Sequence, residues 1–460
     1  MKRALTLTFL ILTIAATVGC GGGSSMQSSQ QSSSASVFVT GEDAPLSSVV
    51  GFQLTLNSIT LNGASNSPQL LAQAETVDFA RLVGLRSPLA FNSVPADTYS
   101  SVTFILANPV ISYVDMTQNP PALNTINGTL PQSPYTLTVN FPKPMVVGSN
   151  GLAGLKMDLD IRQSVAVNGS GQVTGAVNPV IYVRATRASD PDGQVTDLMG
   201  GLVSVNAAGN SFVLQGPYGR QLTVYVNNST QFNSGWSIND LATPAVVGVQ
   251  DAFQADGSLM ASGVEVITTA QSFLSGRVLA VTTNASNQAQ QITMWVGETG
   301  ADMVGDVDTI QTIDVSQVST YDICFLNGPI TDAVFNDSTL VVGQRVFIGG
   351  SFASSVFTPT MISLRLQGVY GTFVPASVVV ANGNAGSFQL SNNGLVGYSV
   401  GGPVTVNTFN LTYFNNLTGL GQLQTTTTAI PLVTRGLLLK DPVSGNPEVY
   451  AGFVSEPAQN

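Results

Sequence analysis

Apolar and polar residues alternate with a period of two along most of the chain from Ser36 onward. In residues 135–141, for example, Tyr, Leu, Val and Phe alternate with Thr and Asn, and residues 52–56 and 155–161 repeat the pattern. Because successive side chains of a strand point to opposite faces, each run predicts a β-strand with one face on a core and one in water. Helical periodicity is nearly absent, and residues 77–85 predict a turn or two of helix at most.

Short turn signals and one change in composition divide the chain. Dipeptides that favour tight turns separate the apolar runs, at Asn62-Gly63, Asn127-Gly128, Asn168-Gly169 and Asp192-Gly193. A polar stretch at residues 188–193 follows the strand-like residues 179–184. We therefore predict an N-terminal β-sandwich-like domain over residues 36–190.

Beyond this boundary the chain contains a weak repeat. Three units begin with glycine-led apolar strands, at Gly200-Gly201-Leu202, at Gly276-Arg277-Val278 and at Gly368-Val369-Tyr370. Each unit has five or six strand-like runs and enough residues for a core of its own. The sequence thus predicts an all-β fold with about three small β-barrel or sandwich modules in tandem, over residues 195–270, 271–366 and 367–460.

The N-terminus carries the features of a secretory signal. Lys2 and Arg3 precede an apolar run that is too short for a spanning helix, so residues 1–19 are interpreted as a signal peptide. The following Thr17-Val18-Gly19-Cys20 resembles the bacterial lipobox, although Thr17 replaces the usual leucine. The resemblance implies a lipoprotein in which Cys20 is the acylated first residue of the mature chain, carrying fatty acids such as palmitate. The alternative is ordinary cleavage after Gly19, which would leave Cys20 as an exposed thiol.

Charge restricts how such a protein could meet a membrane. Residues 20–35 are rich in Gly, Ser and Gln and predict a flexible tether without a basic patch. Removal of residues 1–19, which hold two basic residues and no acid, changes the net charge from -11 to -13. Electrostatic attachment to anionic lipid and nucleic-acid binding are therefore excluded, and acyl chains on Cys20 would be the membrane anchor. Because Gly21 is not Asp, we expect the outer membrane of a bacterial envelope, facing the periplasm or the surface.

The chain contains no histidine, which removes most catalytic templates and histidine-ligated metal sites. Carboxylates are the remaining acid–base groups, and they occur in three sets: Asp158 with Asp160, Asp190 with Asp192 and Asp197, and Asp302 with Asp306 and Asp308. We interpret these sets as a solvated strand face, a polar interdomain turn and a solvated loop, with a metal or catalytic site as the alternative. Cys324, in an apolar run, is interpreted as a small buried residue. We expect no catalytic residue, metal or cofactor.

Aromatic side chains at turns are the remaining candidates for ligand contacts, since rings stack on the faces of sugars. Tyr113, Tyr218 and Trp236 are the candidates, and Tyr218 and Trp236 have glycine neighbours. Partial burial in a core is the alternative role for each of them.

Two resemblances cover most of the mature chain. Residues 36 to about 187 resemble the bacterial lipoprotein family called domain of unknown function 4382, through Gly41-Glu42-Asp43-Ala44-Pro45, Thr76-Val77-Asp78-Phe79 and Val94-Pro95-Ala96-Asp97-Thr98-Tyr99. Residues 198–267 resemble domain of unknown function 5666, a small barrel-like module that often occurs in several copies. These resemblances imply a fold and a location, and no catalytic residue.

From these observations we expect a non-catalytic, lipid-anchored surface protein with a role in adhesion, scaffolding or ligand presentation. Its partners would be the lipid bilayer, through Cys20, and a glycan or another envelope protein. The alternative function is that of an extracytoplasmic carbohydrate-binding or polysaccharide-processing accessory protein.

Overall fold

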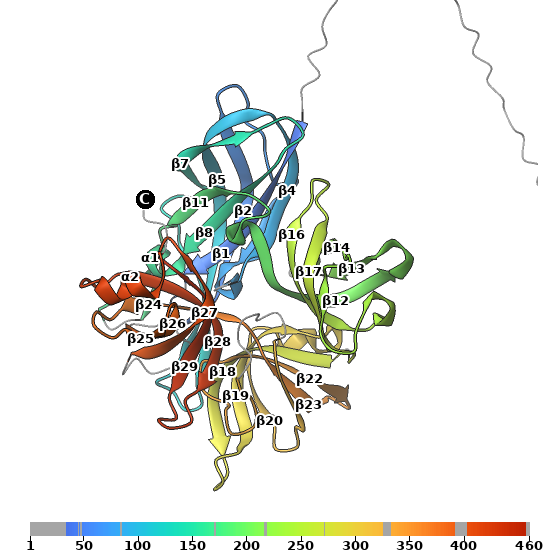
Figure 1. The fold of residues 1–460 in the computed structure, drawn as a ribbon, viewed down its shortest axis with the longest axis vertical. Coiled ribbons are helices and arrows are strands. Elements are labelled where there is room, and N and C mark those ends of the chain that lie inside the picture. The colour runs from blue at the N-terminus through green and yellow to red at the C-terminus, as the bar shows by residue number, and fades with distance from the viewer. Residues whose placement is uncertain are drawn as a thin grey trace, which may run out of the picture. The chain divides into compact units, whose positions relative to one another are not determined.

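The computed structural model describes residues 34–44, 46, 48–82, 85–169, 172–215, 219–270, 272–324, 333–391 and 403–456. Nearly all regular structure in these residues is β-strand, which confirms the predicted all-β fold of several small modules (Figure 1). In this part of the chain, no helix has both the length and the apolar character needed to cross a membrane.

Strands β1–β11 form the N-terminal sandwich. Its first sheet has the order β11-β8-β1-β4, with β11 (Ile181–Thr186), β8 (Leu152–Asp160), β1 (Ser34–Ala44) and β4 (Ser87–Pro95). The second has the order β3-β2-β5-β6, with β3 (Glu75–Asp78), β2 (Val49–Gly63), β5 (Asp97–Asp115), β6 (Ala122–Asn127) and, paired to β5, β7 (Tyr135–Val147). β9 (Val165–Val167) pairs with β10 (Val173–Val177). Apolar side chains from both main sheets, such as Leu54 and Leu155, enclose one core, as the alternating pattern predicts.

The first module has six strands, five of which form a closed barrel, drawn in green in Figure 1. The strands are β12 (Gln194–Asn206), β13 (Ser211–Gln215), β14 (Gln221–Tyr225), β15 (Gln231–Phe232), β16 (Val246–Phe253) and β17 (Leu259–Thr268). β12 pairs with β13 on one side and with β16 on the other, and the parallel pairing of β14 with β17 closes the ring. The short β15 pairs with β17 alone.

The second and third modules vary this plan. The second has the order β20-β19-β18-β22-β23-β21, with β18 (Ser272–Thr283), β19 (Ala289–Thr299), β20 (Thr309–Asp314), β21 (Thr320–Ile323), β22 (Arg345–Ala353) and β23 (Val356–Leu364). The third has the order β24-β28-β29-β27-β26-β25, with β24 (Gln367–Phe373), β25 (Val379–Asn382), β26 (Ala385–Ser391), β27 (Val404–Asn415), β28 (Pro431–Lys440) and β29 (Pro447–Ser455). Pairing of β24 with β26 closes the third module into a ring.

The helices of the described residues are at most six residues long. Within residues 77–85, the predicted short helix is the 3-10 turn η1 (Phe79–Leu82), and α1 (Ile161–Ser164) and α2 (Leu420–Thr425) are the α-helices of the described residues. The remaining 3-10 turns lie between strands: η2 (Pro191–Gly193), η3 (Ala207–Gly209), η5 (Ile238–Asp240) and η6 (Ala301–Asp306).

The modules share parts of their cores. Phe38 of β1 belongs to the core of the first module, where its ring stacks on Phe253 with 4.8 Å between the centroids. In the same way, Leu437 and Leu439 of β28 pack into the core of the second module. The cores of the first and second modules therefore include side chains from a neighbouring unit, in addition to those of their own strands.

Candidate functional site at the junction of the modules

The aromatic candidates do not form one surface. Tyr113 is partly buried against the core of the sandwich, and Trp236 is partly buried against the core of the first module. Tyr218 and the proposed lipidation site Cys20 lie outside the described residues. The alternative role in core packing therefore describes Tyr113 and Trp236 better than exposed stacking does.

Instead, the structure brings together charged side chains from distant parts of the chain. Oδ2 of Asp197 accepts a hydrogen bond from Nη1 of Arg345 at 2.7 Å, and Oδ1 accepts one from Arg365. Arg365 also donates to Oε1 of Glu265 at 2.9 Å. All four residues are buried. We call Asp197, Glu265, Arg345 and Arg365 the ionic network.

A local irregularity of β12 positions Asp197. The pairing of β12 with β16 shifts register between Val195 and Leu198, and Asp197 has a φ of 48°. Aspartate tolerates this left-handed conformation better than most residues. The bulge interrupts the strict alternation of the strand at Asp197. The Asp197 carboxylate forms ion pairs with Arg345 and Arg365 of the second module.

Arg365 and Glu265 are positioned by regular strands. Arg365 follows β23, and its backbone N–H donates to the carbonyl oxygen of Arg345 at the start of β22. Glu265 lies on β17 opposite Gly248 of β16. A Cβ atom at Gly248 would lie 3.0 Å from Nη2 of Arg365, so the glycine leaves room for the guanidinium.

The charges of the network compensate one another. Burial by itself would lower the pKa of Arg365, but Asp197, Cys324 and Glu265 hold that pKa above its ordinary value. Removing one partner of such a buried pair leaves an uncompensated charge, which is strongly destabilising. The first module is thus linked to the start of β22 and to the residue after β23 by buried, paired charges.

The network also occupies a candidate metal site. Oxygen atoms of Asp197 and Glu265 and Sγ of Cys324 all lie within 4.8 Å of one another. Arg365 donates to both carboxylates, so a guanidinium already supplies the positive charge that a metal ion would bring. Cys324 is buried, as predicted, and its Sγ lies 3.9 Å from Oδ1 of Asp197.

Contacts beside the network extend to the sandwich and the third module. The backbone N–H of Thr196 donates to the carbonyl oxygen of Arg86. Oγ1 of Thr196 accepts hydrogen bonds from the backbone N–H of Arg86 and from Nη1 of Arg435 of β28, both at 3.2 Å. Near them, Glu42 of β1 pairs with Lys156 of β8 at 2.7 Å. Burial alone would raise the pKa of Glu42, but Lys156, Arg86 and Arg435 hold it below its ordinary value.

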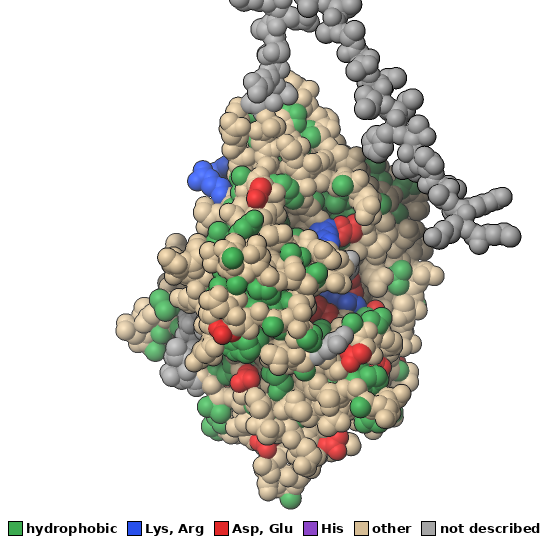
Figure 2. Space-filling view, turned by 90° about the vertical axis from the view of Figure 1, so that its right-hand side faces the viewer, with side chains coloured by type: hydrophobic (Ala, Val, Ile, Leu, Met, Phe, Trp, Pro, Cys, Tyr) green, Lys and Arg blue, Asp and Glu red, His purple; other side chains and the backbone are tan. Residues whose placement is uncertain are grey.

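A cavity of about 230 Å³ lies beside the network. Its lining comes from the sandwich, the first module and the second module, and includes Arg81, Arg86 and Arg345 together with Asp197 and Glu298. Figure 2 shows how sparse charged side chains are on the face that it presents, and how Lys or Arg lie beside Asp or Glu near its centre. Exposed charge is therefore sparse on this face, and charged side chains near its centre lie next to opposite charges.

Two of the three carboxylate sets differ from their interpretation as solvated groups. The prediction of a solvated strand face is wrong at Asp160, which is buried and caps α1 by accepting a hydrogen bond from the backbone N–H of Gln163. The prediction of a polar turn is wrong at Asp197, which belongs to the ionic network. Asp308 pairs with Arg81 of the sandwich at 3.1 Å.

A signal for the network is present in the sequence. Lys and Arg together number only 15 in 460 residues, yet Arg277, Arg345, Arg365 and Arg435 each stand inside an apolar strand-like run. An arginine in such a run is a candidate for burial beside a carboxylate. Period-two alternation alone does not indicate which carboxylate it meets.

Comparison with known proteins identifies one segment. Residues 200–265 match a family described as Domain of unknown function (DUF5666), which confirms the predicted resemblance of the first module. The match begins three residues after Asp197 and ends at Glu265. No match was found among curated proteins. The first module is therefore similar to a domain family whose function is unknown.

Proposed function

We propose that this chain is a non-catalytic, lipid-anchored protein of the bacterial cell envelope, with a role in adhesion, scaffolding or ligand presentation. In this proposal the sandwich and the three modules act as one rigid body. The ionic network is the observation that supports the rigid body, because Asp197 and Glu265 belong to the first module and Arg345 to the second. In the folded chain these charges are buried and paired, so removal of one partner would leave a buried charge uncompensated.

Shared cores support the same proposal. Phe38 of the sandwich is fully buried in the core of the first module, and Leu437 of the third module is fully buried in the core of the second. Domains joined by small polar contacts move relative to one another by default, whereas large apolar contacts hold them together. A rigid arrangement suits a protein that holds a binding surface away from a membrane.

The chemistry of the ionisable side chains supports a non-catalytic role. The chain has no histidine, and the carboxylates of Asp197 and Glu265 are engaged by arginine. The lipobox-like segment before Cys20 and the uncharged residues that follow support the envelope location.

The anchor is tested by labelling and fractionation of cells that express the wild type or Cys20→Ser, with a clickable fatty acid in the medium. We expect label and membrane association for the wild type, and no label for the variant. An unlabelled wild-type protein in the soluble periplasmic or secreted fraction would overturn the envelope-anchor proposal.

The role is tested on a glycan array with the purified full chain. Specific, saturable binding to one glycan class would favour the alternative, a carbohydrate-binding accessory protein. Absence of glycan binding, together with cross-linking to another envelope protein in intact cells, would support adhesion or scaffolding.

A further inference from the structure

We propose that the cavity beside the ionic network binds a small organic anion, with an oxyanion group carried on a short aliphatic part. This inference rests on the side chains that line this cavity and a small one that shares part of its lining, and it does not depend on the membrane anchor.

Arg277 is the first observation. It lies on β18 and lines a small cavity of about 30 Å³, which shares Arg81, Glu298 and Arg345 with the larger cavity. Within the described residues, the guanidinium of Arg277 forms no hydrogen bond and no ion pair. Burial, and then the nearby Arg345, lower the pKa of Arg277 to about 9. A guanidinium with five donors and no acceptor beside a cavity is suited to a carboxylate or phosphate group.

The charge balance of the lining points the same way. Four arginines line the two cavities, namely Arg81, Arg86, Arg277 and Arg345, whereas the acids that line them are Asp197 and Glu298. Asp197 is already bound by Arg345 and Arg365. The whole chain, in contrast, has a net charge of -11. A chain with few basic residues thus places four of them around two cavities that share part of their lining. Arg81 is paired there with Asp78 and Asp308.

Two further hydrogen-bonding groups at this place lack a partner in the described part of the chain. They are Nε1 of Trp295 and Oγ1 of Thr299, both buried. Trp295 lines the small cavity and Thr299 the larger one. The indole N–H is a hydrogen-bond donor only, and the hydroxyl can also donate. Both groups can therefore donate hydrogen bonds to a ligand that is rich in acceptor oxygens.

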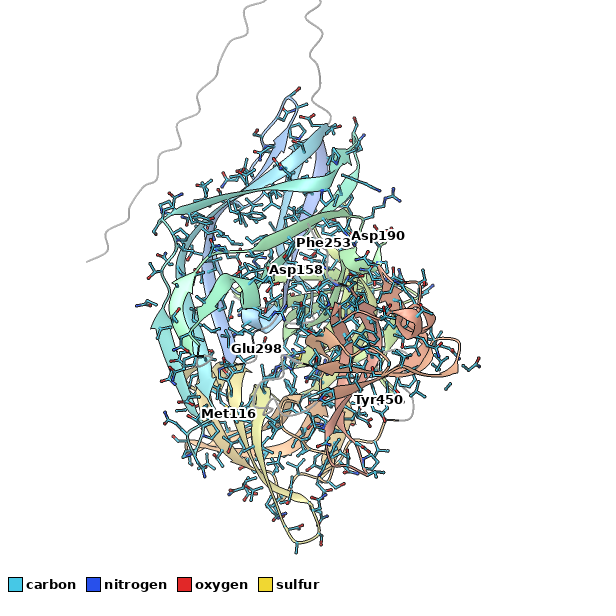
Figure 3. All side chains as sticks on the ribbon, turned by 90° about the vertical axis from the view of Figure 1, so that its left-hand side faces the viewer. Met116, Asp158, Asp190, Phe253, Glu298 and Tyr450 are labelled. Atoms are coloured by element: carbon cyan, nitrogen blue, oxygen red, sulfur yellow. The ribbon has the colours of Figure 1, made fainter. Side chains whose placement is uncertain are left out.

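The local backbone fixes the position of Arg277. A Cβ atom at the preceding Gly276 would lie 1.9 Å from the carbonyl oxygen of Trp295, so only glycine permits this approach of β18 and β19. Glu298, labelled in Figure 3, lies near the end of β19, away from the hairpin turn that joins β18 and β19. Its carboxylate would repel an anion, which makes it a useful site for a variant.

The apolar side chains of the lining indicate the chemistry of the part of the ligand that carries no charge. Six apolar side chains line the larger cavity: Leu82, Leu85, Leu198, Met199, Val304 and Val307. A volume of about 230 Å³ corresponds to roughly eight water molecules at the density of the liquid. An inorganic ion would leave these apolar groups in contact with water, whereas a short alkyl chain would cover them.

The test measures binding of hexanoate to the purified full chain by calorimetry and by the shift in melting temperature. Hexanol is the neutral control of the same length, inorganic phosphate is the anion without an alkyl part, and sodium chloride matches the ionic strength. We expect saturable stabilisation by hexanoate, weaker binding of phosphate and hexanol, and no saturable effect of chloride. Equal stabilisation by chloride would overturn the site, and phosphate binding as tight as hexanoate would overturn the aliphatic part.

Three variants locate the binding. Arg277→Met should weaken hexanoate binding by about tenfold or more, because it removes a charged donor. Arg187→Met, which removes an exposed arginine outside the cavity lining, should leave binding unchanged. Glu298→Gln should tighten binding by about threefold, because it removes a like charge.

Arg277 has no partner among the described residues, so its loss breaks no ion pair, and circular dichroism checks that the variant folds. Unchanged binding in Arg277→Met, or weaker binding in Glu298→Gln, would overturn the proposal. Because the Glu298 variant predicts a gain, it also keeps the test decisive if the Arg277 variant does not fold.

Discussion

Nη1 of Arg345 lies 2.7 Å from Oδ2 of Asp197, although 148 residues separate the two in the sequence. The contact joins the start of β22 in the second module to the bulge of β12 in the first. Arg365 holds the other oxygen of the same carboxylate. A single aspartate therefore links the strands of two modules.

Arg365→Met tests the strength of this link. The variant removes the charged hydrogen bonds that Arg365 donates to Asp197 and Glu265, so we expect a loss of about 3 to 5 kcal/mol in the free energy of unfolding. Urea denaturation of the full chain measures it. Arg187→Met, at an exposed position, should change stability by about 0.5 kcal/mol or less. Similar stabilities of the two variants would contradict a structural role for the network.

Gly248→Ala tests the space around the guanidinium. The added methyl group would lie 3.0 Å from Nη2 of Arg365 and 3.4 Å from Oδ1 of Asp197. Because both atoms are held in a buried ion pair, we expect a loss of about 1 to 3 kcal/mol from overpacking. Thermal melting measures the loss. Gly201→Ala, where an added Cβ meets no atom within 4 Å, is the matched control and should melt close to the wild type.

Asp251→Asn tests a carboxyl group that is buried in the first module. Its oxygens have no hydrogen-bond partner in the described residues, and burial raises its pKa well above the ordinary value. The folded chain therefore holds a proton that the unfolded chain releases above about pH 4, so the wild type loses stability as the pH rises from there toward the folded-state pKa. The variant has no such loss, and its advantage over the wild type should grow with pH.

Melting temperatures between pH 4 and pH 8 measure this difference. Asp322→Asn removes an exposed carboxylate and should show no growing advantage. If the gap between Asp251→Asn and the wild type stayed constant across the range, the carboxyl group would not be buried as a neutral acid.

Asp160→Ala tests the corrected position of this residue at the start of α1. Asp160 accepts a hydrogen bond from the backbone N–H of Gln163, so the variant should lose about 0.5 to 2 kcal/mol. Asp160→Asn keeps an oxygen acceptor and should lose much less. Equal losses in chemical denaturation would show that charge, not the cap, stabilises this turn.

The sequence by itself determined the strands. The alternation in residues 135–141 and 52–56 depends only on which side chains point to the same face, and β7 and β2 follow it. Chain composition excluded histidine chemistry in the same direct way. The family match at residues 200–265 likewise rests on sequence alone.

Only the tertiary structure decided where the charges meet. Asp197 has the sequence surroundings of a polar linker, and Asp160 those of a solvated strand face, yet both are buried. Their environment depends on which elements pack over them, and those elements lie far away in the sequence. Local alternation specifies the face of a strand, whereas the burial of a charge is set by the partner that covers it, such as Arg345 for Asp197.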